Sequence, residues 1–111
     1  HRPAEGMSSG AFRHGPMEML DPDVCLVVFA GAARTRALNE ALVADVRAAG
    51  ARAFLAADDA PEEALRLPAV GDLARPVVEL LPVEMVTLAM AALDGREAGR
   101  FERATKVTAS E

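Results

Sequence analysis

The chain has 111 residues, 51% of them hydrophobic and 26% charged, and its 12 basic and 17 acidic side chains give a net charge of −5. This length allows one domain or part of one, and the ordinary hydrophobic fraction argues against a disordered chain. The acidic balance argues against a nucleic-acid or anionic-membrane surface, where clustered Lys and Arg would supply most of the affinity. Arginine occurs 11 times, whereas Lys106 is the single lysine.

The start of the sequence and its one cysteine bear on cellular context. Because the chain begins at His1 without an initiator methionine, we interpret it as processed, truncated or part of a longer reading frame. Residues 1–15 contain no continuous apolar run of the kind found in a signal peptide. Cys25 alone excludes a disulfide framework and a Cys-based zinc site, and it is expected to be a small core residue. We therefore take the cytoplasm as the default compartment.

The first half of the chain predicts a βαβ unit. Residues 4–12 indicate the end of a helix that is broken at Gly15-Pro16. Residues 24–30, VCLVVFA, form a continuous apolar run that suits a strand covered on both faces. Residues 35–49 predict an amphipathic helix closed by Gly50, and residues 52–57 predict a second strand. The apolar stripe of that helix comprises Leu38, Leu42, Val46 and Ala49.

The second half predicts one more strand and a long helix. Residues 64–68 read as a weaker third strand. Residues 74–93 predict a helix, kinked at Pro82, whose apolar positions cover more than one stripe. We expect this helix to be buried on two sides, against the sheet and, as one option, against another subunit. Its two carboxylates, Glu79 and Glu84, argue against a membrane span.

Together these elements predict an α/β fold with a thin parallel sheet. The first strand would lie at an edge, yet its composition is that of a central strand, and native proteins avoid an apolar, uncharged edge. The sequence therefore suggests further strands, most simply upstream of His1.

Two side chains are candidates for chemistry. His14 lies in Phe12-Arg13-His14-Gly15-Pro16, where a rigid bend would present an imidazole suited to proton transfer near neutral pH. A helix-end histidine bonded to a backbone carbonyl is the alternative. Lys106 lies near the end of a polar tail, where an amine could pair with phosphate or attack a carbonyl. A solvated surface lysine is the alternative there.

Other polar groups give weaker signals. The acidic residues of 58–63 have no metal-ligand spacing and read as a solvated turn. Residues 31–34, GAAR, lie between a strand and a helix, where anions often bind, but they lack the glycine pattern of a nucleotide loop.

Residues 4–20, AEGMSSGAFRHGPMEML, resemble the segment that precedes the last half of a sugar isomerase (SIS) domain. The resemblance is to the second such domain of the isomerising glutamine–fructose-6-phosphate aminotransferases and their stand-alone double-SIS relatives. The following strand, the helix with Leu81-Pro82-Val83-Glu84 and the tail Ala104-Thr105-Lys106-Val107-Thr108 agree in order. The form of residues 13–18, RHGPME, is closer to the stand-alone double-SIS proteins.

The resemblance implies a three-layer α/β sandwich with a parallel, flavodoxin-like sheet, present here as its C-terminal part. Residues 1–95 would be the C-terminal half of a SIS domain, and residues 96–111 a tail that closes over the site. It implies a site for phosphorylated sugars at the carboxyl ends of the strands. It also implies a homodimer with a shared site, and neither cofactor nor metal.

The resemblance assigns catalytic roles to the same two residues. The histidine matched by His14 opens the sugar ring by moving a proton, in a site shared across the dimer. The lysine matched by Lys106 forms an imine with the ketose carbonyl. The family's phosphate-binding loops and its proton-shuttling carboxylate match no residue of this sequence and would lie upstream of His1. We therefore expect the 111-residue piece alone to be inactive.

The hypothesis is a fragment of an aldose–ketose isomerase or aminotransferase-type enzyme acting on hexose or hexosamine 6-phosphates. A non-catalytic SIS module that senses a phosphosugar within a regulator is the second hypothesis. A third, an acidic α/β domain of unrelated function, requires both motif matches to be coincidental.

Overall fold

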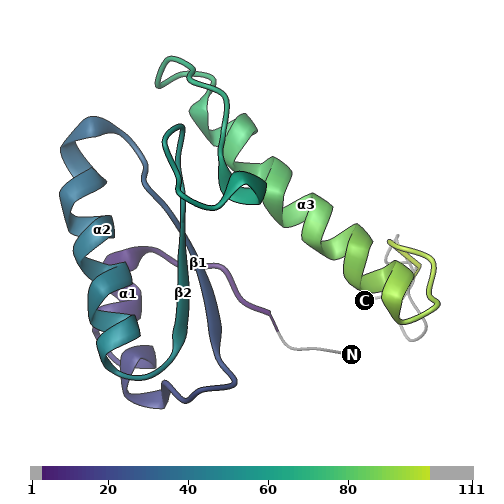
Figure 1. Ribbon diagram of the computed structural model, residues 1–111, viewed down its shortest axis with the longest axis horizontal. Coiled ribbons are helices and arrows are strands. Elements are labelled where there is room, and N and C mark those ends of the chain that lie inside the picture. Colours follow the sequence, from purple (N-terminus) through teal and green to yellow (C-terminus); the bar gives the residue numbers. More distant parts are fainter. Residues whose placement is uncertain (1–3, 101–111) are drawn as a thin grey trace, which may run out of the picture. The chain divides into compact units, whose positions relative to one another are not determined.

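A computed structural model describes residues 4–100 (Figure 1). The chain divides into two compact units, residues 1–79 and residues 80–111, and helix α3 runs across their boundary. In chain order the elements are α1 (Ser9–Arg13), the 3-10 helix η1 (Pro16–Met19), β1 (Cys25–Phe29), α2 (Ala33–Ala48), β2 (Arg52–Ala56), the 3-10 helix η2 (Glu63–Leu65) and α3 (Arg75–Leu93).

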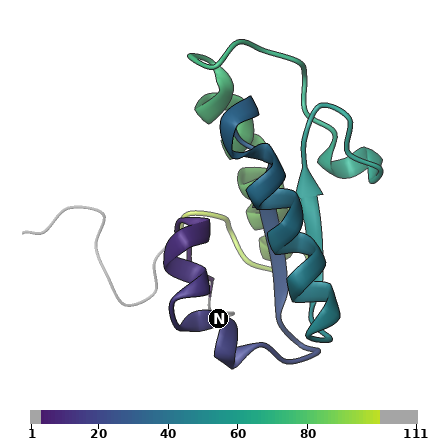
Figure 2. The same cartoon turned by 90° about the vertical axis from the view of Figure 1, so that its left-hand side faces the viewer.

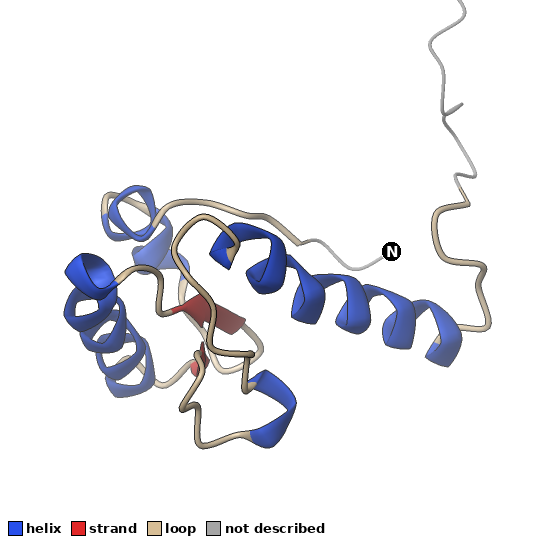
Figure 3. Ribbon diagram, turned by 90° about the horizontal axis from the view of Figure 1, so that it is seen from above, coloured by secondary structure: helices blue, strands red, loops and turns tan. Residues whose placement is uncertain are grey.

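The predicted βαβ unit is confirmed. Strands β1 and β2 pair in parallel, in a register from Cys25 opposite Arg52 to Phe29 opposite Ala56. The helix α2 connects them and lies along one face of the pair, as Figure 3 shows from above. Gly50 takes a φ of +90° just after α2, a conformation that favours glycine and ends the helix where the sequence predicted. The α/β class with parallel strands is therefore confirmed.

The core of the first unit lies between α2 and the sheet. Val46, the most deeply buried large side chain of α2, is fully enclosed there. The buried cluster consists of Phe12, Val28, Leu42, Val43, Val46, Ala51 and Ala53. The predicted stripe on α2 is half right: Leu42 and Val46 are buried, but Leu38 is 68% exposed and Ala49 is exposed. At the amino-terminal half of α2, Thr35 and Asn39 occupy the inward positions instead.

The predicted third strand at residues 64–68 is wrong. In this segment a single parallel bridge joins Ala57 to Arg66, and η2 occupies Glu63–Leu65. Two hydrogen bonds make the bridge, from Ala57 N to Leu65 O and from Leu67 N to Ala57 O. The segment turns too tightly before the bridge to extend, and Pro68 after it has no N–H to donate to a ladder.

The prediction that Cys25 is a core residue is also wrong, because its side chain is exposed. Along β1 the side chains alternate between two faces. Leu26 and Val28 pack into the cluster beneath α2, whereas Cys25 and Val27 point to the opposite face and are exposed. The strand is thus covered on one face and not, as expected, on both.

Helix α3 has the predicted extent but not the predicted burial. It runs unbroken from Arg75 to Leu93 through Pro82, and none of its residues is buried. Val77 is 70% and Leu93 85% exposed. By length and composition α3 could also cross a membrane, with a mean hydropathy of 1.7 over 18 residues. A kink at Pro82 stays a prediction.

Candidate functional site

The segment that carries His14 is a short helix followed by a tight turn. Ser8 caps α1 by accepting a hydrogen bond from Ala11 N to its side-chain oxygen at 3.2 Å. His14 ends α1, and its backbone N–H donates to Ala11 O. Gly15 and Pro16 then lead into η1, where Glu18 N donates to Gly15 O. The predicted helix end is confirmed only in part, because α1 covers Ser9–Arg13 and residues 4–8 are not helical, whereas the predicted break at Gly15-Pro16 is confirmed.

Three side chains hold α1 against α2, beside which it lies in Figure 2. Ser9 Oγ donates to Asn39 Oδ1 at 2.7 Å, and Arg13 Nη1 donates to Asp45 Oδ2 at 2.7 Å. Between these two contacts Phe12 enters the core and is 9% exposed. The α1 segment is therefore fixed to α2 at both of its ends.

His14 itself is exposed, and no residue in the range 4–100 makes a side-chain hydrogen bond or ion pair with its imidazole. The direction in which α1 runs along α2 shows where His14 lies. Asn39 is in the first half of α2, near the carboxyl end of β1, whereas Asp45 is in the second half, which leads to the amino end of β2. Because His14 follows Arg13, it lies toward the amino ends of the strands.

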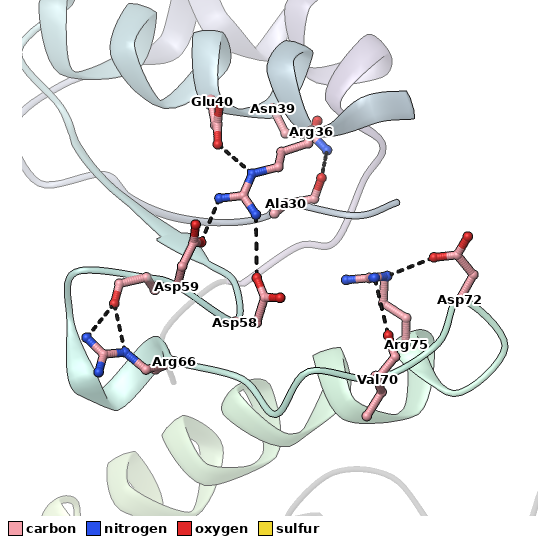
Figure 4. Close-up of polar contacts among 11 residues, drawn as sticks. Ala30, Arg36, Asn39, Glu40, Asp58, Asp59, Arg66, Val70, Asp72 and Arg75 are labelled. Carbon is pink, nitrogen blue, oxygen red and sulfur yellow. Dashed lines mark hydrogen bonds and ion pairs between the residues drawn. The ribbon is translucent and has the colours of Figure 1, made fainter. Parts of the chain in front are cut away.

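The carboxyl ends of the two strands form a separate polar region, shown in Figure 4. Asn39 Nδ2 donates to Ala30 O at 3.0 Å, just after β1. Arg36 on α2 reaches three carboxylates: Glu40 at 2.7 Å on its own helix, and Asp58 at 3.4 Å and Asp59 at 2.6 Å just after β2. Arg36 thus fastens the segment that follows β2 to helix α2.

The electrostatics of this region follow from the Arg36 contacts. The hydrogen bond from Arg36 lowers the pKa of Asp59 below its ordinary value, and the same contact raises the pKa of Arg36. Below this pair, Arg66 Nε and Nη2 both donate to Ala60 O at 3.1 Å. The predicted solvated turn is confirmed at Asp58 and Asp59, which lie in an exposed turn, and Arg36 in addition fastens that turn to α2.

Other predicted features make no site within the described residues. Residues 31–34 lead into α2, whose N-cap, Ala32, offers no side-chain hydrogen bond. Among residues 4–100 no group of three or more His, Cys, Asp and Glu side chains could hold a metal ion. Lys106 and most of the tail at 96–111 lie outside the described residues.

A shallow hollow lies along the face of α2 that also carries Glu40, the partner of Arg36. Arg47 crosses it, with its Nε donating to Ala53 O at 2.8 Å and its Nη2 lying 3.7 Å from Glu62 Oε1. The hollow is lined by Glu40, Val43, Arg47, Leu55, Pro61 and Glu62. It contains neither residue that the sequence singled out for chemistry.

Sequence reasoning missed four polar residues that organise these regions. Arg36 and Glu40 have the i, i+4 spacing of a helix ion pair, a signal that was readable in advance. Asn39 occupies an inward position between Thr35 and Val43 and could have been found by that periodicity. Asp45 carries no local signal, because its partner Arg13 is 32 residues away.

Comparisons with known proteins bear on which of these regions is functional. No family model matches, and no solved structure matches. Curated relatives do: an isomerising glutamine–fructose-6-phosphate aminotransferase from Streptomyces coelicolor is 30% identical over 105 residues, which is 85% of this chain and 17% of that protein. Those of Haemophilus influenzae and Thermus thermophilus are 25% and 29% identical, also over 85% of the chain.

The chain resembles part of an isomerising glutamine–fructose-6-phosphate aminotransferase. The resemblance seen in the His-Gly-Pro block and the tail is thereby confirmed for most of the chain. The chain spans 17% of the length of these aminotransferases. Their activity is therefore that of much longer proteins, of which this chain matches one portion.

Proposed function

We propose that this chain is the C-terminal half of a SIS domain from a phosphosugar isomerase or aminotransferase-type enzyme, with residues 96–111 as the tail that closes over the site. Similarity to fructose-6-phosphate aminotransferases across 85% of the chain carries the proposal. The substrates are hexose or hexosamine 6-phosphates. The compartment is the cytoplasm.

His14 is the proposed acid/base that opens the sugar ring. Ring opening moves a proton between the anomeric hydroxyl and the ring oxygen, a task suited to an imidazole that is neutral or protonated near pH 7. Its exposure on an anchored segment supports this role. Its place toward the amino ends of the strands, away from the carboxyl edge, suits a site shared between the two subunits of a homodimer.

Lys106 is the proposed nucleophile. Its amine attacks the ketose carbonyl, water leaves, and the resulting imine acidifies the adjacent C–H for aldose–ketose proton transfer. Arginine could not replace it, because a guanidinium stays protonated at any working pH. The placement of the single lysine in a chain with 11 arginines supports this role.

The test uses the complete protein that carries this segment. Lys106→Ala should leave phosphosugar binding largely intact and lower turnover of fructose 6-phosphate about 100-fold or more, because a covalent route is removed. Lys106→Arg is the matched control and should not restore turnover. Unchanged turnover in Lys106→Ala would remove this residue from the mechanism.

A phosphosugar-sensing module of a regulator is the second candidate. It predicts binding without turnover in the complete protein. Isothermal calorimetry with glucosamine 6-phosphate, beside an isomerisation assay, separates the two functions. The 111-residue chain alone should show no turnover; isomerisation of fructose 6-phosphate by it would contradict the proposed division of the domain.

A further inference from the structure

Helix α1 cannot hold its own conformation. It has five residues, little more than one turn, and isolated helices shorter than about 12 residues are marginal in water. Its shape and place therefore depend on what binds it to the rest of the unit. Within residues 4–100, Ser9 and Arg13 bind side chains of α2, and Phe12 packs in the core between α2 and the sheet.

The Arg13–Asp45 contact is the one nearest to His14. It joins the neighbouring position 13 to α2 at 2.7 Å, and the two side chains are 38% and 46% exposed. Ser9 and Asn39 make the contact at the opposite end of α1, a full turn away. On the far side of His14, the 3-10 helix η1 makes hydrogen bonds, among the described residues, only within its own segment, and Met17 packs against the core cluster.

Loss of the Asp45 carboxylate would free this end selectively. Phe12 would keep α1 on the core and Ser9 would keep its start on Asn39, so the unit would remain folded. The last turn of α1, which carries His14, would keep its apolar neighbours Phe12 and Met17 on the core but would lose its ion pair with α2. Errors of about 1 Å in the placement of a catalytic group can cost about 100-fold in rate.

We propose that Asp45 is a positioning residue for His14, acting through Arg13 to fix the end of α1 that presents the imidazole. The inference rests on the proposed function, because it takes His14 as the acid/base of ring opening. Asp45 touches no substrate; its effect passes through the Arg13 guanidinium and one turn of backbone.

The test has a structural arm on the 111-residue chain. In Asp45→Ala, backbone 15N relaxation should show increased motion at the His14 and Gly15 amides, with the amides of β1 and β2 unchanged. Asp45→Asn keeps the side-chain volume and serves if the alanine variant folds poorly. Asp72→Ala is the matched control, because it removes another exposed arginine–carboxylate pair, with Arg75, and should leave the His14 amide unchanged.

The kinetic arm uses the complete protein. Asp45→Ala should lower kcat about 10- to 100-fold with KM within about twofold, since orientation of the acid/base and not substrate binding is lost. The reversed pair, Arg13→Asp with Asp45→Arg, should recover most of kcat, whereas either reversal alone should not. A merely structural role for Asp45 would not lower kcat while leaving KM unchanged, and the reversed pair would not then recover kcat.

The outcomes separate the two hypotheses. Unchanged motion at His14 or unchanged kcat in Asp45→Ala overturns the positioning role while leaving the proposed function standing. If the amides become mobile but the unmodified complete protein has no turnover, the proposed function fails, and Asp45 is reduced to a structural contact. Loss of kcat without rescue by the reversed pair also overturns the inference.

Discussion

At the scale of single residues, Gly31 shows how tightly the carboxyl end of β1 is packed. It takes a φ of +71°, and a Cβ built there would lie 2.7 Å from Thr35 Oγ1 and 3.4 Å from Asn39 Nδ2. Thr35 cannot easily swing away, because its hydroxyl donates to Ala32 O at 3.0 Å. Both the backbone conformation and the space therefore require glycine.

Gly31→Ala should consequently lower the free energy of unfolding by about 1–3 kcal/mol, through a strained φ and a close contact. Urea denaturation followed by circular dichroism measures this. Gly10→Ala is the control: Gly10 lies in α1 with no atom within 4 Å of a new Cβ, so alanine should be neutral or stabilising. Equal stabilities for the two variants would contradict the geometry at Gly31.

The Asp59–Arg36 pair makes the stability of the fold depend on pH in the acid range. The pKa of Asp59 is lowered in the folded state by Arg36, so the pair stabilises the fold above the ordinary carboxyl pKa of about 3.9. The stabilisation is lost as the pH falls through the lower, folded-state value. The urea midpoint should thus decrease from about pH 5 downward.

Asp59→Asn should flatten that acid dependence, and Arg36→Gln should flatten it too, because either change removes the pair. The measurement is the urea midpoint at several values between pH 3 and pH 7. The effect should be small, because the pair is exposed and solvent screens it. If the urea midpoint of these variants fell with decreasing pH as steeply as in the unmodified chain, the acid dependence would come from other carboxylates.

At the scale of elements, α2 has different inward faces along its length. Its second half buries leucine and valine on the sheet, whereas its first half turns Thr35 and Asn39 inward to bind backbone carbonyls. This arrangement satisfies the polar groups where the chain leaves β1. It leaves Leu38 outside.

Two identical substitutions on α2 test which leucine is inside. Leu42→Ala should cost about 2–4 kcal/mol, because Leu42 is 2% exposed and its removal leaves a cavity. Leu38→Ala should cost less than about 0.5 kcal/mol. Urea denaturation of both variants gives the comparison, and a larger loss at Leu38 would place that side chain in the core.

At the scale of the whole molecule, helix α3 exposes a large apolar area. Leu80, Met85 and Leu88 are each at least half exposed in a helix without a buried residue. Contiguous apolar surface of this kind is unusual in a soluble monomer and marks a place of contact. The sequence pattern reported the apolar character of α3 correctly, but burial depends on neighbours that a pattern does not contain.

The 111-residue chain should therefore bind a dye specific for apolar surface, such as ANS, under native conditions. Met85→Gln with Leu88→Gln should reduce the fluorescence, whereas Thr87→Gln on the same helix should not, because Thr87 bonds its hydroxyl to Val83 O and adds no apolar area. Absence of dye binding would mean that α3 is covered in solution, which sedimentation at several concentrations would detect.

The order of elements could be read from the sequence because each is encoded locally. The apolar run at β1, the periodicity of α2 and the glycine after it depend on neighbouring residues, so their positions were predicted within one or two residues. The third strand failed because Ala57 and Arg66 make only a single bridge, and the number of bridges depends on how the intervening loop closes.

What the sequence alone determined about this protein is its α/β class, its βαβ unit and, through the His-Gly-Pro block, its resemblance to part of an aminotransferase. Only the tertiary structure decided that Arg13 binds Asp45, that Arg36 fastens the loop after β2 to α2, and that Cys25 is exposed. The physical reason is distance along the chain. Local propensities act over a few residues, whereas these contacts join residues 22 to 32 positions apart. The exposure of Cys25 depends in turn on whether another element covers its face of the sheet.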